Sequence, residues 1–444
     1  AVGEGLAVVE LLVPEAAPAY PDLSGLFPAA GRMQRALFDL LGVGASGATD
    51  ARPWLRHGAW PEGAFPLRRD FDPAALPPNA LTDYAFVRVE GDGVHEIPVG
   101  PIHAGIIEPG HFRFSIVGEK VLRLEARLGY VHKGIEKRFE TLRVAEGHRL
   151  AGRVSGDSTV AFAWAYAQAA ESLLGVVPPP RARWTRALAL ERERVANHLG
   201  DLGALGNDAA LAFALSQFSR LREDWLRASG EIFGHRLLMD LVVPGGVAAG
   251  FDAGAAERMD KQSRAIEAEV RDLRAIFDEH AGLQDRFLTT GRVTPDLARK
   301  LGLAGLAGRA SAQAFDLRCD FPAVPYGELA VKKAGYAAGD VAARVNLRFD
   351  EVLESLRLVR ALAMSAPDGE LRVELPQPAP DAFGVGWVEG WRGEAFVAIE
   401  AGDDGMIRRC HVHDPSWQNW PVIEHAVIGN IVPDFPLINK SFNL

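Results

Sequence analysis

Cysteine is scarce in this chain of 444 residues. Only Cys319 and Cys410 are present. Two thiols cannot build a disulfide framework, and they cannot supply the four thiolates of a sulfur-ligated metal centre. The sequence therefore excludes both kinds of site within this chain.

Long hydrophobic runs are also absent. The longest nearly apolar stretch, 160–170, is too short to cross a bilayer, and no secretory signal pattern is present. We therefore expect a cytoplasmic chain with no membrane span of its own, which reaches any membrane through partner subunits. The chain begins with Ala1, and one interpretation is that both of its ends are trimmed.

Positive charge is outnumbered, because 48 basic residues against 58 acidic ones give a net charge of −10. This balance disfavours nucleic acid as a partner. Hydrophobic residues make up 48% of the chain, and we find neither low-complexity tracts nor internal repeats. Such a chain is expected to form a globular protein with two or three domains and a large core.

The hydrophobic pattern predicts the fold class α+β. We expect a large helical-bundle core flanked by small antiparallel sheets, with a small N-terminal α+β domain. Helical or continuously apolar patterns occur at 33–41, 152–175, 183–201, 211–238, 255–281 and 350–365. Strand patterns occur at 6–13, 112–128, 385–389, 396–400 and 406–412, with turns at Gly118-Glu119, 244–247 and Arg392-Gly393.

The most site-like stretch of the sequence is 97–140. Its first part is rich in glycine, proline and histidine, and it contains His103, Glu108 and His111. The alternating segment 112–128 follows directly. The residues alone leave two interpretations open: an acid and two imidazoles gathered on a functional loop, or a capped strand pair with surface histidines.

Two long motifs in this stretch carry a family resemblance. GPIHAGIIEPGHF at 100–112, followed by GYVHKGIEK at 129–137, resembles the large subunit of group 4 membrane-bound nickel–iron hydrogenases of the formate hydrogenlyase type. It also resembles the homologous quinone-proximal subunit of respiratory complex I. The resemblance implies a large-subunit domain over 79–444.

The N-terminal part resembles a second complex I protein. FPAAGRMQRALFDLLGV at 27–43 and PLRRDF at 66–71 are similar to the C-terminal part of the small hydrophilic complex I subunit. The resemblance implies a partial small-subunit α+β domain over 1–78, fused ahead of the large subunit, with a linker at 73–78.

The resemblance to the hydrogenase branch implies a nickel site whose ligands are missing here. In that branch four thiolates hold nickel, and two of them come from a CxxC pair near the start of the buried helix. The matching text is RVSGDS at 153–158, with serine at both cysteine positions, Ser155 and Ser158. A hydroxyl does not replace an ionised thiolate as a nickel or iron ligand. DFPLINKSFNL at 434–444 matches the approach to the second pair. We predict that the chain has lost the nickel–iron site and binds no metal.

The complex I branch implies a quinone site with an incomplete set of donors. PPPRARWTRALALERERVANHLGDLGALGND at 178–208 resembles that subunit and places Asp208 at its quinone-site aspartate. The tyrosine and histidine that complete the site correspond to Gly156 and Ile107. The two histidines of the loop are the candidate replacements.

With the metal ligands missing and the quinone donors incomplete, the resemblance implies that proton transfer by carboxylates is the chemistry left to this chain. Glu108 matches the carboxylate that gates protons in the hydrogenases, and we expect it to be buried beside the former metal cavity. The alternative is that Glu108 caps its turn and pairs with an arginine such as Arg153. Asp157 is either a new functional group or a solvated residue. The candidate catalytic residues are Glu108, Arg153, Asp157 and Asp208, and the candidate cofactor-binding residues are His103, His111, Ser155 and Ser158.

Two further pairs of polar residues have simpler interpretations. Glu191 and His198 share a helix face and are expected to belong to a buried, hydrogen-bonded network. His411 and His413 alternate on the last strand, where a metal site is one interpretation and an accidental exposed pair is the other.

The resemblance predicts the core subunit of a membrane-bound, ion-translocating redox complex at the cytoplasmic face of a bacterial inner membrane. Its implied partners are a small Fe–S subunit with a neighbouring 4Fe–4S cluster, a ferredoxin-like Fe–S subunit and antiporter-like membrane-arm subunits. Electrons from the cluster would be coupled to proton transfer or to reduction of a quinone-like acceptor. The alternatives are a quinone-reducing subunit of the NADH:quinone oxidoreductase type and a non-catalytic scaffold joining the two arms.

Overall fold

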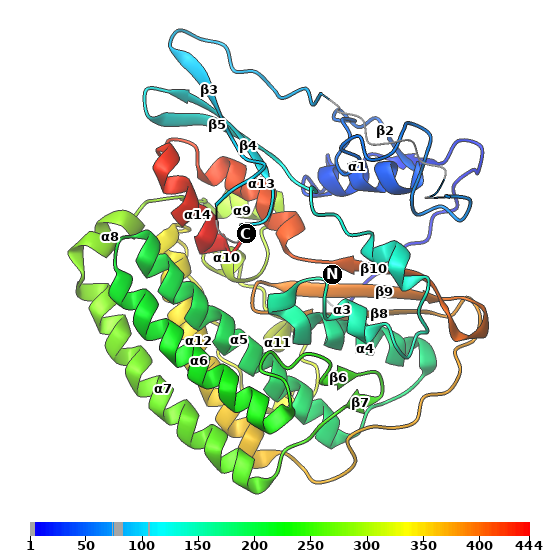
Figure 1. The fold of residues 1–444 in the computed structure, drawn as a ribbon, viewed down its shortest axis with the longest axis vertical. Helices are drawn as coiled ribbons and strands as arrows, with labels where there is room; N and C mark the ends of the chain where they lie inside the picture. Colours follow the sequence, from blue (N-terminus) through cyan, green and yellow to red (C-terminus); the bar gives the residue numbers. More distant parts are fainter. Residues whose placement is uncertain (1–4, 73, 75–82, 105–106) are drawn as a thin grey trace.

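The computed structural model describes residues 5–72, 74, 83–104 and 107–444. Figure 1 shows long helices side by side on one side of the molecule, a helix-backed sheet beside them, and a smaller N-terminal unit at a corner. The sheets of three strands are both antiparallel. This arrangement confirms the predicted α+β class with a helical-bundle core.

Four long helices form the bundle, and the central one is α5. They are α5 (Pro180–Asp208), α6 (Ala212–Phe233), α7 (Ala253–Glu279) and α12 (Val341–Ser365). Helix α5 packs against both α6 and α12, so most of its residues are buried. It begins at Pro180, where the fixed φ of proline suits a first helical residue. The prediction of 183–201 was therefore right in place and too short at both ends.

Helix α4 (Thr159–Leu174) packs against a sheet of β8 (Phe383–Glu389), β9 (Glu394–Ala401) and β10 (Ile407–His413). Strand β8 reaches the helix backbone because it presents glycine. A Cβ added at Gly384 or Gly386 would lie 2.1 Å from a carbonyl oxygen of α4. Close approach of this kind is a positional use of glycine in strands. The predicted helix at 152–175 starts later, at Thr159, because 152–158 turns to form the candidate site.

The predicted hairpin is confirmed. Strands β4 (His111–Val117) and β5 (Lys120–Arg127) pair around Gly118 and Glu119, and β3 (Val94–Val99) adds to the other edge of β4. Gly118 has φ +58°, a left-handed conformation that glycine adopts without strain. This sheet projects beside the C-terminal helices in Figure 1.

The N-terminal unit has its own small core. Helix α1 (Ala30–Leu41) confirms the predicted helix, and β1 (Ala19–Pro21) pairs in parallel with β2 (Gly44–Ser46). The buried residues of this core are Ala36, Leu40, Trp54, Leu55 and Leu67.

One strand prediction in this unit was wrong. Residues 6–13 are irregular, and Leu12 is 98% exposed. A strand needs a neighbour for its backbone hydrogen bonds, and here the described residues supply none along this segment. The predicted linker 73–78 lies, apart from residue 74, outside the described residues.

Shorter elements join these parts. The helices are α2 (Ile135–Phe139), α3 (His148–Ala151), α8 (Ala281–Phe287), α9 (Pro295–Leu301), α10 (Gly305–Arg309), α11 (Leu317–Asp320), α13 (Ser416–Ala426) and α14 (Phe435–Phe442). A tight hairpin of β6 (Val242–Val243) and β7 (Gly246–Val247) confirms the turn predicted at 244–247. In the described part of the chain, no helix is both long enough and apolar enough to cross a membrane.

Candidate functional site

The candidate site begins where the predicted serine pair precedes α4. A 3-10 turn over Gly156–Ser158 brings Ser155 and Ser158 to one aspartate. The Ser155 hydroxyl donates to Asp157 Oδ1 at 2.6 Å, and the Ser158 hydroxyl lies 3.4 Å from the same oxygen. The two serines therefore surround a carboxylate of this chain.

Arg392, in the turn between β8 and β9, pairs with that carboxylate. Its Nη2 lies 2.6 Å from Asp157 Oδ2, and its Nε donates to the backbone oxygen of Asn443 at 2.9 Å. Burial disfavours the guanidinium charge, but Asp157 and Asp414 outweigh burial and raise the pKa of Arg392. Trp391 Nε1 donates to the Ser158 hydroxyl at 3.1 Å, which holds this turn against the start of α4.

A continuous set of polar contacts extends from Asp157 across the molecule. Asn443, after α14, accepts from Arg392 and donates to Asp201 Oδ1 on α5 at 2.7 Å. Lys440 lies 2.8 Å from the same Asp201 oxygen. We call this set of five residues, Asp157, Arg392, Asn443, Asp201 and Lys440, the Asp157 network.

Asp201 is almost fully buried within this network. Burial alone would raise its pKa, but Lys440 and Arg348 outweigh burial and lower the pKa of Asp201. Arg348 donates to Asp201 Oδ2 through Nε and Nη2, at 3.1 and 2.9 Å. The charges of the network are therefore paired and hydrogen-bonded, as buried charges require.

Asp208 lies at the end of the same helix, α5, and is exposed. Local desolvation raises the pKa of the Asp208 carboxyl, and the charge of Lys440 opposes that rise. Lys440 thus acts electrostatically on both Asp201 and Asp208. Among the described residues Asp208 has no hydrogen bond or ion pair with the Asp157 network, so it lies outside that network.

These residues do not fit a nickel–iron centre. Ser155 and Ser158 offer neutral hydroxyls, which are hard donors, where a soft metal needs thiolates. The carboxylate between them, that of Asp157, is already paired with the guanidinium of Arg392. This fixed positive charge repels a metal cation. Among the described residues, no three His, Cys, Asp or Glu side chains gather in a metal-binding arrangement.

The two loop histidines hold the loop to the sheet. His103 Nε2 donates to the Gly110 carbonyl at 2.7 Å, and His111 Nδ1 donates to the Gly100 carbonyl at 3.2 Å. Burial lowers the pKa of His111, and the carbonyl of Gly100 only partly opposes that effect. Each ring therefore has one nitrogen engaged with the backbone, and the second nitrogen of His111, Nε2, accepts from Arg113 Nε at 3.4 Å.

The prediction that the Glu108 side chain is buried was wrong. Its side chain is exposed, and it forms no hydrogen bond or ion pair with the residues that the structure describes. The loop carries Glu108 on its outer side, beside exposed Ile107. The alternative pairing with Arg153 was also wrong, because Arg153 binds Asp240 through both terminal nitrogens at 2.6 and 2.7 Å. Asp240 raises the pKa of Arg153.

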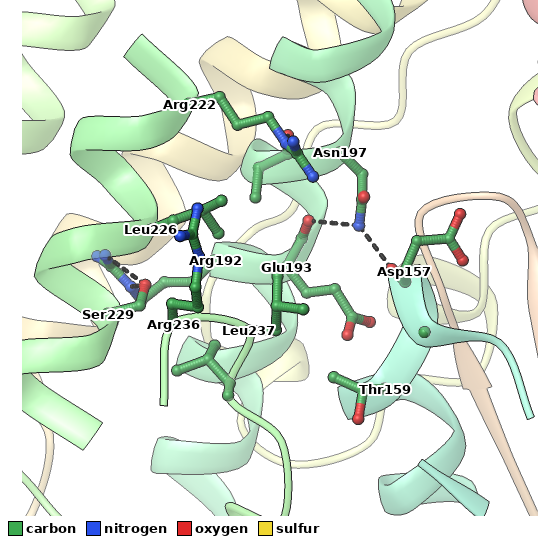
Figure 2. Close-up of a pocket in the computed structure, with 13 residues that line it drawn as sticks. Asp157, Thr159, Arg192, Glu193, Asn197, Arg222, Leu226, Ser229, Arg236 and Leu237 are labelled. Atoms are coloured by element: carbon green, nitrogen blue, oxygen red, sulfur yellow. Dashed lines mark hydrogen bonds between the residues drawn. The ribbon is translucent and has the colours of Figure 1, made fainter. Parts of the chain in front are cut away.

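Behind the serine turn lies a cavity of about 210 Å³. We call it the polar cavity, and its lining includes Asp157, Thr159, Arg192, Glu193, Asn197 and Arg236. Figure 2 shows the Glu193 carboxylate directed toward the start of α4, between Asp157 and Thr159. Glu193 is not among the residues predicted from the sequence, since helical periodicity alone does not show that a second helix begins opposite it.

Glu191 and His198 lie in the buried, hydrogen-bonded network predicted for them, whereas His411 is exposed and His413 is half-buried, so the two are not the exposed pair that was one interpretation. His198 Nε2 lies 2.8 Å from Glu351, and Glu191 accepts from the Tyr326 hydroxyl at 2.7 Å and the Ser355 hydroxyl at 2.6 Å. His411 binds Glu136 at 2.7 Å. His413 binds Gln418 at 2.8 Å, so the two strand histidines have separate partners.

Comparisons with known proteins place these observations in a family. The model of the respiratory-chain NADH dehydrogenase 49 Kd subunit matches residues 208–382, and that of the 30 Kd subunit matches residues 5–76. Formate hydrogenlyase subunit 5 of Escherichia coli K12 is 31% identical over 431 residues, which cover 96% of this chain and 76% of the relative. This chain belongs to the family of large subunits shared by group 4 hydrogenases and complex I. It carries a fused domain of the 30 Kd kind.

Other similar proteins agree with this membership. Hydrogenase-4 component G of Escherichia coli K12 is 32% identical over 440 residues, 98% of this chain and 76% of the relative. A chain of the membrane-bound sulfane sulfur reductase, an archaeal respiratory membrane complex, superposes with a TM-score of 0.74 at 24% identity. The match covers 79% of this chain and 97% of that chain, and this likeness shows a shared fold.

Proposed function

We propose that this large subunit works without a nickel–iron centre in a membrane-bound, ion-translocating redox complex at the cytoplasmic face of a bacterial inner membrane. It couples electron delivery from a neighbouring Fe–S cluster to proton transfer or to reduction of a quinone-like acceptor. The expected partners are a small Fe–S subunit, a ferredoxin-like Fe–S subunit and antiporter-like membrane subunits.

The Asp157 network is the observation that carries this proposal. In the hydrogenase branch two thiolates occupy the positions of Ser155 and Ser158, whereas here the hydroxyls bind Asp157. A carboxylate that accepts from two hydroxyls and pairs with a guanidinium is held in a fixed orientation, so it can receive a hydrogen bond from water or from an acceptor group at this turn. A site of this kind supports proton transfer in place of metal chemistry.

The experiment uses the complex purified from native membranes, reduced by a low-potential donor. We expect Asp157→Asn to lower proton-coupled turnover by roughly tenfold or more, while the complex still assembles. The matched control is Asp414→Asn, which removes the other carboxylate near Arg392, 3.6 Å from its Nη1. Full turnover in Asp157→Asn, or nickel at one atom per complex, contradicts the proposal.

Quinone reduction is a second candidate, and the position of Asp208 favours it. The carboxyl is exposed at the end of α5, and desolvation raises its pKa, so it is suited to give a proton to a reduced acceptor. Two electrons from the cluster and two protons would convert a quinone to its quinol. Unchanged reduction of a quinone analogue by Asp208→Asn would exclude this version.

The scaffold alternative has its own outcome. A Glu108→Gln, Asp208→Asn double variant that keeps full ion pumping would show that neither acid takes part in coupling. Together with an inactive Asp157→Asn variant, that result would place coupling at the serine turn. With an active Asp157→Asn variant, it would leave the chain as a structural joint between the two arms.

A further inference from the structure

The polar cavity contains a carboxylate with an unusual environment. Glu193 is 7% exposed, and its two oxygens accept the backbone N–H groups of Val160 at 2.6 Å and Ala161 at 3.1 Å. These N–H groups belong to the first turn of α4, which has no side-chain cap of its own. Glu193 therefore caps α4 from another helix.

No cation compensates this carboxylate directly. Among the described residues, none of the ion pairs includes Glu193. Burial raises the pKa of Glu193 to about 8, the two backbone N–H groups oppose the rise, and the charge of Asp157 adds to it. A carboxyl in this setting changes its protonation state close to neutral pH.

Two other groups that line the cavity are buried and lack partners among the described residues. They are the hydroxyl of Thr159, 2% exposed, and Nη1 of Arg192, whose side chain is 1% exposed. The other nitrogens of Arg192 donate to Ser229 and to the Trp225 carbonyl. Buried polar groups of this kind are normally satisfied by ordered water. A cavity of about 210 Å³ has room for several water molecules.

The cavity extends from the serine turn, where the Asp157 side chain is 38% exposed, past Glu193 to Arg236. At the end formed by the turn, the Asn197 amide donates to the backbone oxygens of both Asp157 and Glu193, at 2.6 and 3.0 Å (Figure 2). The other end is lined by Arg236, whose side chain is 52% exposed and pairs with Glu223. The remaining charged groups on its walls are Arg192 and Arg222.

We propose that the polar cavity holds a water chain and that Glu193 is a proton-carrying residue that exchanges protons between this water and Asp157. In each cycle the Glu193 O–H bond breaks and its proton passes through water to the Asp157 carboxylate, which gives a proton to the reduced acceptor. Glu193 regains a proton from hydronium at the Arg236 end of the cavity, so one proton moves from solvent to the acceptor in each cycle. This inference rests on the proposed function, because it names the route that supplies its proton-transfer site.

The test uses the purified complex and three variants. Glu193→Gln removes the titrating oxygen with little change in shape, and Ala196→Leu fills the cavity, which Ala196 lines, without touching a charge. The control is Glu231→Gln, at an exposed position on α6. Turnover is measured against pH and in D₂O, together with the infrared band of protonated carboxyls.

We expect Glu193→Gln and Ala196→Leu each to lower proton-coupled turnover by roughly tenfold or more, with cluster reduction unchanged. The wild-type rate should fall as pH rises through about 8, and Glu193→Gln should lose that inflection and one carboxyl band titrating there. Glu231→Gln should match the wild type.

The outcomes separate this inference from the proposed function. If Asp157→Asn is inactive while Glu193→Gln and Ala196→Leu keep the wild-type rate and pH profile, the water route is wrong and the proposed function stands. If Asp157→Asn is also fully active, the proposed function fails first. Phosphate is added to the purified complex as a probe of the three cavity arginines, Arg192, Arg222 and Arg236. If phosphate binds there and stabilises the complex against unfolding, the cavity is an anion site and the water route is wrong.

Discussion

Asp157 owes its character to residues that are distant in sequence. It lies between two serines, but Arg392 gives it a charge partner and Trp391 fixes the turn on which it sits. Glu193 is a second case, because its environment comes from the start of α4 and not from its own helix. The chemistry of each acid is therefore a property of the contacts made by the fold.

Removing the guanidinium should destabilise the chain. Arg392→Met leaves Asp157 and Asn443 without their hydrogen bonds to Arg392, so we expect the free energy of unfolding to fall by about 2–3 kcal/mol. Urea unfolding of the chain measures this change. The matched control is Arg408→Met, which breaks surface ion pairs with Glu400 and Asp381 and should change the free energy of unfolding much less than Arg392→Met. Equal losses in the two variants would contradict a special role for Arg392.

Glu193 should also make stability depend on pH. Its pKa is raised from 4.5 to about 8 by burial, so the folded chain keeps a proton that the unfolded chain has released. The stability from this group is present below about pH 4.5 and is lost as pH rises through about 8. Denaturant unfolding at pH 5, 6, 7 and 8 should give a steeper fall for the wild type than for Glu193→Gln. Parallel curves would show that Glu193 does not titrate in this range.

Packing of α4 against β8 determines where the serine turn can lie. The apolar text of the helix predicts its burial, and the helix is indeed buried nearly all round. The identity of its neighbour depends on Gly384 and Gly386, whose missing side chains let the strand reach the helix backbone. The same strand leads into the turn that carries Trp391 and Arg392.

A methyl group at Gly386 should disrupt this contact. Its Cβ would lie 2.1 Å from the Ala165 carbonyl oxygen, so Gly386→Ala forces the helix and strand apart. We expect a loss of at least about 2 kcal/mol in the free energy of unfolding. Gly25→Ala is the control, because a Cβ there meets no atom within 4 Å. If the two variants are equally stable, the helix and strand are not in such close contact.

At the scale of the whole molecule, the N-terminal unit is joined to the large domain by buried and half-buried polar contacts. Arg52 pairs with Glu125 of β5 at 2.6 Å, and Arg32 pairs with Glu424 of α13 at 2.6 Å. Glu125 also accepts the backbone N–H of Val87 at 2.9 Å. The buried residues of the small core are separate from those of the main core, but Leu128 and Trp417 of the large domain pack against the small core, so these polar contacts act together with apolar packing to hold the unit in place.

Breaking the ion pair between Glu125 and Arg52 should therefore increase local opening in the N-terminal unit and leave the large domain unchanged. In Glu125→Gln we expect faster amide hydrogen exchange across 19–72, with exchange in α4 and α5 unchanged. Mass spectrometry of exchanged peptides measures both regions in one experiment. Glu62→Gln is the control, because Glu62 is 91% exposed in its pair with Arg56. Uniform loss of protection across both regions would mean that the chain unfolds as a single unit.

The family, the α+β class, the positions of the long helices and the hairpin could all be predicted from the amino-acid sequence. These follow from local periodicity and from residue identity, which do not depend on distant contacts. The sequence could not predict that Glu108 is exposed, that residues 6–13 form no strand with the described residues, or that Arg153 pairs with Asp240. Folding brings Arg392, Asn443 and Glu193 to the serine turn. These contacts could not be predicted from local pattern, because they join distant segments: Arg392 and Asp157 are 235 residues apart in the sequence.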